Sequence, residues 1–242
     1  MEKMIYLNIG NTNTQVFSDH GVKTITTNAL VDCSLLYKIL QIERDEACIF
    51  IVSSVVPKAS LALQRTFTKA EFKFITWEML SWIDFSDVDP TTIGADRLAN
   101  LAAVSNLKLP AMVIDFGTAI TTEVLSADFK FLGGNILPGR QLSRLALEQH
   151  TAQLPKTPLT LEEPPVLGTT TVEAIQTVDS MTIGGIVYLM NRTQDLFKTK
   201  LHIYATGGDA PYFCKCFPDL MKASPELTLE GLKEIQRRLI RR

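Results

Sequence analysis

The sequence lacks the cysteine pattern and the long apolar run that would mark several common classes of protein. Its four cysteines, Cys33, Cys48, Cys214 and Cys216, form no C-x-x-C pair and have no histidine nearby, which argues against both a zinc site and a disulfide framework. No apolar stretch reaches about eighteen residues, and no cationic segment followed by an apolar run stands at the N-terminus. We therefore expect reduced thiols in a cytoplasmic protein with no membrane partner.

The sequence also has little excess of charge of either sign. Its 24 basic and 26 acidic residues give a formal net charge of -2, which provides no global field for a nucleic-acid backbone. The densest basic run, 237–242, is interpreted as a last helical turn with cations near the negative end of the helix dipole. We expect no nucleic-acid partner. With 46% hydrophobic residues in 242, the chain can form two lobes of about a hundred residues each with packed cores.

A strand-turn-strand pattern occurs twice in the chain. In Ile5–Phe17 an apolar run breaks at G-N-T and resumes at once, and Ala111–Leu125 repeats this design around D-F-G-T. Aligning Leu7–Thr12 with Ile114–Ala119 superposes the two turns, which indicates an internal duplication. The sequence therefore predicts an α/β fold with two duplicated lobes, residues 1–108 and 109–242.

Hydrophobic periodicity and turn residues predict the remaining elements. Strands are expected at 4–8, 15–17, 22–26, 47–56, 111–125 with its central turn, 130–132 and 202–205, and helices at 34–43, 57–69, 171–178 and 183–197 and from about 94 and 229. The segment G-G-N-I-L-P-G, Gly133–Gly139, is expected to be a turn. The acidic segment Asp84–Pro90 is interpreted as a solvated connector, because it lacks the glycine and the final glutamate of a calcium loop.

The glycines of these turns are candidates for phosphate binding. A glycine between strands lets the backbone approach a ligand, and successive N–H groups with Thr or Asn side chains form a concavity for anionic oxygens. An isolated G-N-T is more typical of an ordinary hairpin, but two matching copies favour a nucleotide held from both lobes. The glycine pair Gly207-Gly208 would allow an adenosine or ribose to approach, although such a pair is often a plain turn. The candidate ATP and phosphate ligands are Asn8, Gly10, Asn11, Thr12, Gly117, Thr118, Gly207 and Gly208.

Seven motifs give the chain a resemblance to a known family. They are G-N-T (10–12), D-P-T-T-I-G-A-D-R (89–97), D-F-G-T-A-I-T (115–121), G-G-N-I-L-P-G (133–139), T-A-Q-L-P (151–155), G-T-T-T-V-E-A-I (168–175) and T-G-G-D (206–209). In this order they resemble type III pantothenate kinase, of the superfamily of acetate and sugar kinases, heat-shock ATPases and actin. The resemblance implies two ribonuclease-H-like lobes and ATP-dependent phosphorylation of the pantothenate hydroxyl, the first step toward coenzyme A. It also implies Mg²⁺, a monovalent cation (K⁺ or NH₄⁺) and a homodimer whose substrate pocket includes both subunits.

The resemblance implies roles for residues that bind or activate the substrate. Asp96 of G-A-D-R resembles the general base, beside Gly94, and Arg97 would hold the substrate carboxylate. Without the family, Asp96 and Arg97 would be more typical of a helix-start acid and a surface arginine. Thr171 resembles a substrate-contacting hydroxyl. His150 is a candidate for the partner subunit's pocket, although a lone histidine is more often surface or core filler.

The metal ligands are where the sequence departs from the family pattern. Asp115 is a candidate to orient metal-bound water, and Thr121 to help build the cation site. The family's first motif begins with aspartate, and this chain has Asn8, whose amide keeps an oxygen but loses a negative charge. Glu123 replaces a usual aspartate, and Asp87 replaces a usual aromatic residue at the substrate. We expect weakened metal binding.

Two alternatives to a pantothenate kinase stay open at this point. Asn8 and Asp87 favour a catalytically impaired kinase-like protein with a binding or regulatory role, a role described for some relatives of the family. Arg97 would accept many carboxylates, which allows a kinase of another small hydroxy acid. An ATP-consumption assay with pantothenate distinguishes a pantothenate kinase from both of these alternatives.

Overall fold

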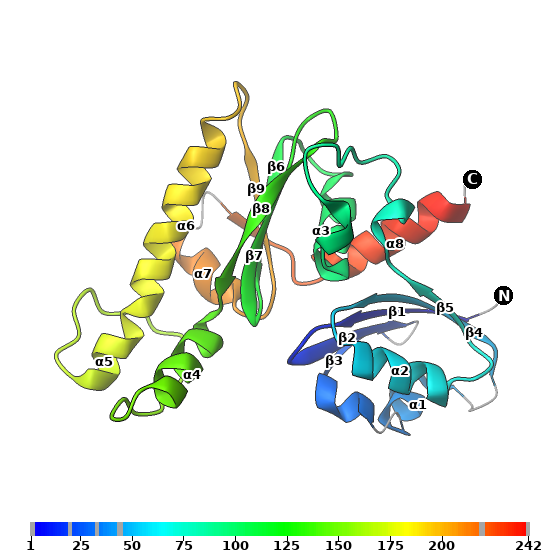
Figure 1. Cartoon of the computed structure of the whole chain (residues 1–242), viewed down its shortest axis with the longest axis horizontal. Helices are drawn as coiled ribbons and strands as arrows, with labels where there is room; N and C mark the ends of the chain where they lie inside the picture. Colours follow the sequence, from blue (N-terminus) through cyan, green and yellow to red (C-terminus); the bar gives the residue numbers. More distant parts are fainter. Residues whose placement is uncertain (1–2, 19–20, 32–33, 43–45, 218–220, 241–242) are drawn as a thin grey trace. The chain divides into compact units, whose positions relative to one another are not determined.

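The computed structural model describes residues 3–18, 21–31, 34–42, 46–217 and 221–240 (Figure 1). They form two compact units: Met1–Leu107 with Asp128–Leu132 and Glu226–Arg242, and Lys108–Ala127 with Gly133–Pro225. The first boundary falls beside the predicted one, while the C-terminal segment packs with the first unit. The division into domains 1–108 and 109–242 stays a prediction.

The first unit is built on a five-stranded sheet with the order β3-β2-β1-β4-β5. Its strands are β1 (Lys3–Ile9), β2 (Asn13–Ser18), β3 (Gly21–Thr26), β4 (Cys48–Ser54) and β5 (Glu71–Phe74). The first three strands pair antiparallel, whereas β4 pairs parallel with β1 and β5 parallel with β4. The parallel pairing of β4 with β1 requires a crossover connection, which includes η1 (Thr27–Val31) and α1 (Ser34–Leu40).

The second sheet repeats this topology strand for strand, with the order β10-β9-β6-β7-β8. Its strands are β6 (Ala111–Phe116), β7 (Ala119–Leu125), β8 (Phe131–Pro138), β9 (His202–Thr206) and β10 (Met221–Ala223). As in the first sheet, the opening strand pairs antiparallel with the next and parallel with the fourth, and the fifth pairs parallel with the fourth. The predicted duplication is confirmed, and each sheet has the strand order of a ribonuclease-H-like lobe.

Helices cover both faces of the first sheet. The helical segments of the unit are α1, η1, α2 (Pro57–Thr66), η2 (Trp77–Met79), η3 (Pro90–Thr92), α3 (Ala95–Val104) and α8 (Leu227–Ile240). Ile5, Leu7 and Phe50 point into a core with α1 and α2. On the other side α8 contacts β1 and β4, α3 contacts β4, and the two helices pack on each other (Figure 1). Since side chains alternate along a strand, Asn8 and Ser53 belong to the face of α3 and α8.

The second unit carries α4 (Arg140–His150), α5 (Thr171–Gln176), α6 (Val178–Gln194) and α7 (Ala210–Cys216). One face of its sheet forms a core with α6 and α7, in which the rings of Phe116 and Phe213 stack 4.3 Å apart. No helix among the described residues is both long and apolar enough to cross a lipid bilayer.

The structure corrects several expectations from the sequence. Most of Gly133–Gly139 is not a turn but the end of β8, because pairing with β7 overrides the turn tendency of its glycines. Helix α6 starts at Val178 rather than at residue 183, and β5 and α4 were not predicted. Cys33, the expected helix end at residue 43, and residues 241–242 lie outside the described part of the chain.

Candidate active site

The turn between β1 and β2 is tight. The Gly10 N–H donates to the carbonyl of Asn13 at 3.0 Å, and a Cβ on Gly10 would come within 3.1 Å of that same oxygen. Asn11 and Thr12 are exposed at the tip. The tip of this turn is therefore open to solvent, and its role in binding phosphate stays a prediction.

Thr27, which the sequence did not mark as part of the site, holds the backbone of this turn through hydrogen bonds. Its hydroxyl donates to the carbonyl of Gly10 at 2.6 Å and lies 3.0 Å from the hydroxyl of Thr14, and its N–H donates to the carbonyl of Thr12 at 2.9 Å. Thr27 is buried, so these bonds are shielded from water. No local pattern marks Thr27, because its partners lie thirteen to seventeen residues earlier.

Asn8 presents an oxygen without a partner beside this turn. Its Nδ2 lies 3.5 Å from Oε1 of Gln15, while its Oδ1 is buried and accepts no hydrogen bond from the described residues. Ser53, its neighbour on β4, has a buried Oγ that likewise makes no hydrogen bond to the described residues. Buried polar atoms are usually satisfied, so these two oxygens point to a missing donor or cation. Both are neutral, which suits a water-mediated contact with Mg²⁺ better than direct charge pairing.

Asp96 lies in the first turn of α3. Its Oδ1 accepts the N–H of Arg97 at 2.8 Å, and a Cβ on Gly94 would lie 2.6 Å from that oxygen. Gly94 therefore leaves the space that the carboxylate occupies. Burial raises the pKa of Asp96 above its ordinary value, and the N–H and charge of Arg97 oppose this shift. A carboxylate with a raised pKa is a better proton acceptor at neutral pH than an ordinary surface aspartate.

The candidate base and the first turn are linked through the end of β4. The N–H of Val55 donates to the carbonyl of Ile9 at 3.1 Å, and the position of a Cβ on Gly94 is 3.5 Å from Cγ1 of Val55. Asn8, Gly10 and the start of α3 thus all belong to the carboxyl ends of β1 and β4. Ligands of open α/β sheets commonly bind at this edge.

In the second unit Asp115 lies near the end of β6. It stands opposite Thr121 on β7 and beside Thr206 on β9. Residues directly opposite each other on antiparallel strands point to the same face, so the carboxylate of Asp115 and the hydroxyl of Thr121 are neighbours. Glu123 shares this face and is fully buried, with an Oε2 that makes no hydrogen bond to the described residues.

Three backbone segments meet at the end of β6. The N–H of Gly139, before α4, donates to the carbonyl of Thr118 at 3.0 Å, and a Cβ on Gly139 would collide with the carbonyls of Gly117 and Thr118. Gly207, with φ +91°, approaches from β9: a Cβ there would lie 2.5 Å from Oδ1 of Asp115. Only glycine permits this approach at 139 and 207.

The Gly117 turn and Gly207 therefore lie close to the carboxylate of Asp115, and the helix start at Gly139 packs on the carbonyls of the Gly117-Thr118 turn. A Cβ on Gly208 would meet nothing within 4 Å, so this side of the pair is open. The described residues contain no group of three or more His, Cys, Asp or Glu that could hold a metal by itself. Mg²⁺ in phosphoryl transfer needs only one or two carboxylates besides phosphates and water, and Asp115 fits that requirement.

The remaining predicted residues lie apart from these glycines. Thr171 begins α5 and lines an apolar surface pocket of about 330 Å³ between α4, α5 and α6, whose lining includes no residue of the glycine turns. His150 is the exposed last residue of α4. Asp87, at the expected substrate-contacting position, forms an ion pair of 2.7 Å with Lys130 in the first unit. The substrate and partner-subunit roles of these residues stay predictions.

Solved structures resemble the fold at low sequence identity. A Campylobacter jejuni protein described as a Baf family transcriptional activator gives a TM-score of 0.62 at 20% identity, over 98% of this chain and 100% of its own. A Sinorhizobium meliloti protein described as a 2-dehydro-3-deoxygalactonokinase gives a TM-score of 0.57 at 12% identity, over 98% and 96%. With the duplicated sheets and the glycine turns at their strand ends, these likenesses define a two-lobed protein of the actin-like ATPase and sugar-kinase fold.

Sequence comparison identifies the family within that class. The model described as "Type III pantothenate kinase" matches residues 4–192. Type III pantothenate kinases of Desulforapulum autotrophicum and Dehalococcoides mccartyi are 30% and 31% identical, covering 96% and 97% of this chain and 95% and 97% of their own. The chain belongs to the type III pantothenate kinase family, as the seven motifs predicted. Membership of a kinase family implies a nucleotide phosphate donor and a small-molecule acceptor.

Proposed function

We propose that the chain transfers a phosphoryl group from ATP to the hydroxyl of pantothenate, giving 4'-phosphopantothenate on the way to coenzyme A. The observation that carries this proposal is Asp96, a carboxylate with a raised pKa at the carboxyl ends of β1 and β4. In this role Asp96 accepts the proton of the attacking hydroxyl, and Arg97 holds the pantothenate carboxylate in a charge-assisted pair.

The glycine turns supply the phosphate contacts in this proposal. Asn11 and Thr12 bind phosphate through their N–H groups and short polar side chains at the turn that Gly10 closes, and Gly117 and Thr118 bind phosphate in their own unit. Each unit offers an oxygen that would suit Mg²⁺: the carboxylate of Asp115 in the second unit and the buried amide oxygen of Asn8 in the first. When bound, this ion neutralises charge that develops on the phosphates. A K⁺ or NH₄⁺ near Thr118 and Thr121 adds to that effect, and the enzyme acts in the cytoplasm.

A direct test is ATP consumption with pantothenate, Mg²⁺ and K⁺ or NH₄⁺. The wild type should turn over, and Asp96→Asn should lower kcat by roughly a hundredfold while ADP affinity stays within about twofold. Asp89→Asn is the matched control: it is the same change in a nearby exposed acid, which accepts the N–H of Thr91 at 3.1 Å and can still do so as an amide. This control should retain wild-type turnover.

A second candidate function is a nucleotide-binding protein without efficient turnover, favoured by the neutral Asn8 and by the Asp87–Lys130 ion pair at the expected substrate position. It requires ADP binding with no pantothenate phosphorylation under any of these cations. Turnover of a different hydroxy acid would instead identify another substrate. Loss of ADP binding in Asp96→Asn would mark Asp96 as structural.

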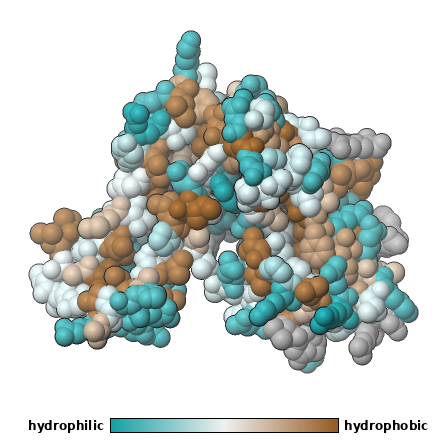
Figure 2. Space-filling model, viewed as in Figure 1, coloured by the Kyte–Doolittle hydropathy of each residue, from teal (hydrophilic) through white to brown (hydrophobic). Residues whose placement is uncertain are grey.

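We also propose a homodimer through the second unit. Several apolar residues of the segment between α4 and α5 and of α6 are more than two-thirds exposed, namely Leu161, Val166, Leu167 and Met181. Met181 lines the same pocket as Thr171, and brown surface gathers at the α4–α5 end of this unit in Figure 2. Exposed apolar side chains of this kind support association, and in the proposed dimer a second copy would bring His150 to a shared pocket.

Light scattering at micromolar concentration tests the dimer. The wild type should have the mass of two chains, and Met181→Glu should have the mass of one because a charge cannot be desolvated at the interface. Leu61→Glu, at an exposed position of α2, is the matched control and should stay dimeric. A monomeric wild type contradicts the shared pocket.

A further inference from the structure

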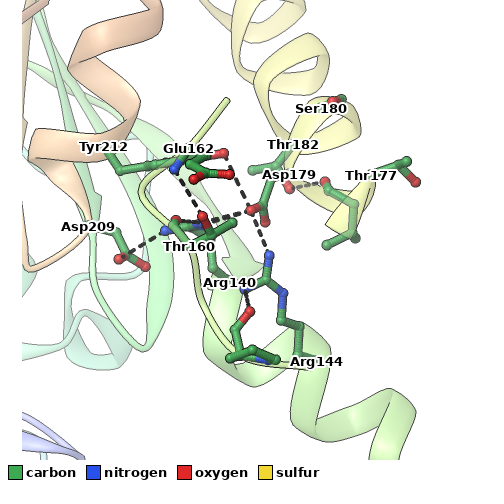
Figure 3. Close-up of polar contacts among 12 residues, drawn as sticks. Arg140, Arg144, Thr160, Glu162, Thr177, Asp179, Ser180, Thr182, Asp209 and Tyr212 are labelled. Atoms are coloured by element: carbon green, nitrogen blue, oxygen red, sulfur yellow. Dashed lines mark hydrogen bonds and ion pairs between the residues drawn. The ribbon is translucent and has the colours of Figure 1, made fainter. Parts of the chain in front are cut away.

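A buried charged cluster joins α4, α6 and α7 in the second unit (Figure 3). Oδ2 of Asp179 accepts Nε of Arg140 at 3.0 Å and Nη2 of Arg144 at 2.8 Å, and it lies 3.4 Å from the hydroxyl of Tyr212. The side chains of Asp179, Arg140 and Arg144 are 0%, 1% and 2% exposed. Two guanidinium groups therefore share one carboxylate away from water, which leaves an excess positive charge.

Asp209 supplies the second negative charge of the cluster. Its Oδ1 lies 3.6 Å from Nη1 of Arg140, whereas the described contacts of Arg144 are to Asp179 and to the carbonyl of Pro158. In Figure 3 the guanidinium of Arg140 lies between Asp179 and Asp209. The same group stacks on the ring of Tyr212 at 3.5 Å, which fixes its plane.

Arg140 occupies the junction of two segments of the candidate nucleotide site. Gly139, the residue before it, packs on the carbonyls of Gly117 and Thr118. Asp209, its partner, directly follows the Gly207-Gly208 pair. Arg140 therefore connects the two segments. Its backbone continues from Gly139, which packs on the Gly117-Thr118 turn, and its side chain pairs with Asp209, which follows the Gly207-Gly208 pair.

The geometry of Asp209 supports this connection. Asp209 is the N-cap residue of α7, where an aspartate ordinarily accepts a backbone N–H of the first turn, yet its side chain makes no such cap bond. It pairs with Arg140 instead, while its N–H donates to the carbonyl of Phe116 at 3.0 Å. Burial raises the pKa of Asp209 and the charge of Arg140 lowers it, so the pairing helps keep this carboxylate ionised.

We propose that Arg140 is a positioning residue for the nucleotide: by holding Asp209 it fixes the Gly207-Gly208 backbone against the end of β6, where the base and ribose are expected. The inference rests on the proposed function, since it assumes a nucleotide at that pair. Arg140 cannot contact the ligand itself because its side chain is only 1% exposed. Arg144 belongs to the same cluster but contacts neither Asp209 nor Gly139 in the described structure.

This difference between the two arginines provides a matched pair of variants. Lysine keeps the charge but has a single ammonium in place of the guanidinium fork, so Arg140→Lys cannot hold Asp179, Asp209 and the carbonyl of Thr160 together. Arg144→Lys disturbs the same buried carboxylate without touching Asp209. Both variants should lower the denaturation midpoint, but only the first should alter nucleotide binding.

The experiment measures ADP affinity by titration calorimetry on the full-length protein. Arg140→Lys should raise the Kd of ADP about tenfold, whereas Arg144→Lys should keep it within about twofold. Asp209→Asn, a nearly isosteric change at a partly exposed position, should raise the Kd of ADP as Arg140→Lys does, because it removes the same ion pair. It therefore also tests the inference if Arg140→Lys fails to fold. In the double variant the two effects should not add, because both remove one ion pair. In turnover, KM for ATP should rise while KM for pantothenate stays unchanged.

Three results would overturn the inference: equal weakening of ADP binding in Arg144→Lys, wild-type affinity in Asp209→Asn, or additive effects in the double variant. A wild type that binds no ADP overturns it together with the nucleotide part of the proposed function. If ADP binding changes as expected but pantothenate is not phosphorylated, the inference stands and only the proposed reaction fails.

Discussion

Replacing Gly231 with alanine should destabilise the protein, although the same change stabilises most helices. Gly231 lies within α8, where it faces α3, and a Cβ at this position would collide with the backbone carbonyl of Ala99. In an unhindered helix, Gly→Ala gains about 1 kcal/mol. Here the methyl group meets backbone rather than a mobile side chain, so the two helices must move apart by on the order of 1 Å.

The cost of that separation follows from the contacts between α3 and α8. Overpacking of a well-packed interface costs about 1–3 kcal/mol, and a radial gap of 0.5–1 Å forfeits roughly a quarter to a half of each dispersion contact. The interface also contains a buried hydrogen bond of 2.8 Å from Thr228 to Asn100, whose loss would add about 1–3 kcal/mol. After the gain in helix propensity of about 1 kcal/mol, Gly231→Ala should lower the free energy of unfolding by about 1–5 kcal/mol.

The matched control is Gly185→Ala in α6, where an added Cβ meets nothing within 4 Å. It should raise the free energy of unfolding by about 0.5–1 kcal/mol. Urea denaturation followed by circular dichroism measures both variants, and the slopes must agree with the wild type for the comparison to hold. Because the first turn of α3 carries Asp96, Gly231→Ala should also lower kcat of the folded protein. Equal or greater stability in Gly231→Ala would refute the packing argument.

Two further predictions concern charge. Burial raises the pKa of Glu234, but hydrogen bonds from Arg237, Arg238 and Asn106 outweigh burial and lower the pKa to about 2. The ionised carboxylate therefore stabilises the fold above its ordinary pKa of 4.5, and this stabilisation is lost as the pH falls from 4.5 to about 2. Glu234→Gln should therefore cost on the order of 2–3 kcal/mol at pH 7 and little near pH 2 in urea denaturation, and an equal cost at both pH values would contradict this. Asn8→Asp should tighten the Mg²⁺ dependence of turnover about tenfold; an unchanged Mg²⁺ titration would exclude Asn8 from the metal site.

The sequence predicts the two sheets well because their signal is local. An apolar strand, a glycine turn and a second apolar strand need only about thirteen residues, and both copies are visible before any tertiary contact is known. The same locality explains why the sequence can single out Asp96 as a candidate, since G-A-D-R places the glycine and the acid within one helical turn. The motif order then identifies the family, because seven spaced motifs are far more specific than any one of them.

The sequence predicts poorly where distant residues decide the structure. Gly133–Pro138 contains turn-forming residues, yet it extends β8 because Thr122 on β7 bonds both the side chain and the N–H of Asn135 at 2.9 Å. Arg140 and Asp179 are 39 residues apart, and neither follows a pattern that marks a buried ion pair. Such pairs depend on which helices meet over the sheet, which hydrophobic periodicity alone does not specify.

Asn8 shows how a fold can be kept while its chemistry changes. The β1–β2 turn does not need a carboxylate at this position, because Thr27 and the bond from Gly10 to Asn13 hold its backbone. Oδ1 of Asn8 is buried without a hydrogen bond to the described residues, so a donor or cation of a ligand at this position would satisfy it. The amide therefore leaves the backbone of the turn intact but removes one negative charge from the candidate site. The corresponding residue of the second strand-turn-strand copy, Asp115, keeps the carboxylate that Asn8 lacks, so the duplicated fold tolerates either side chain at this position of the strand.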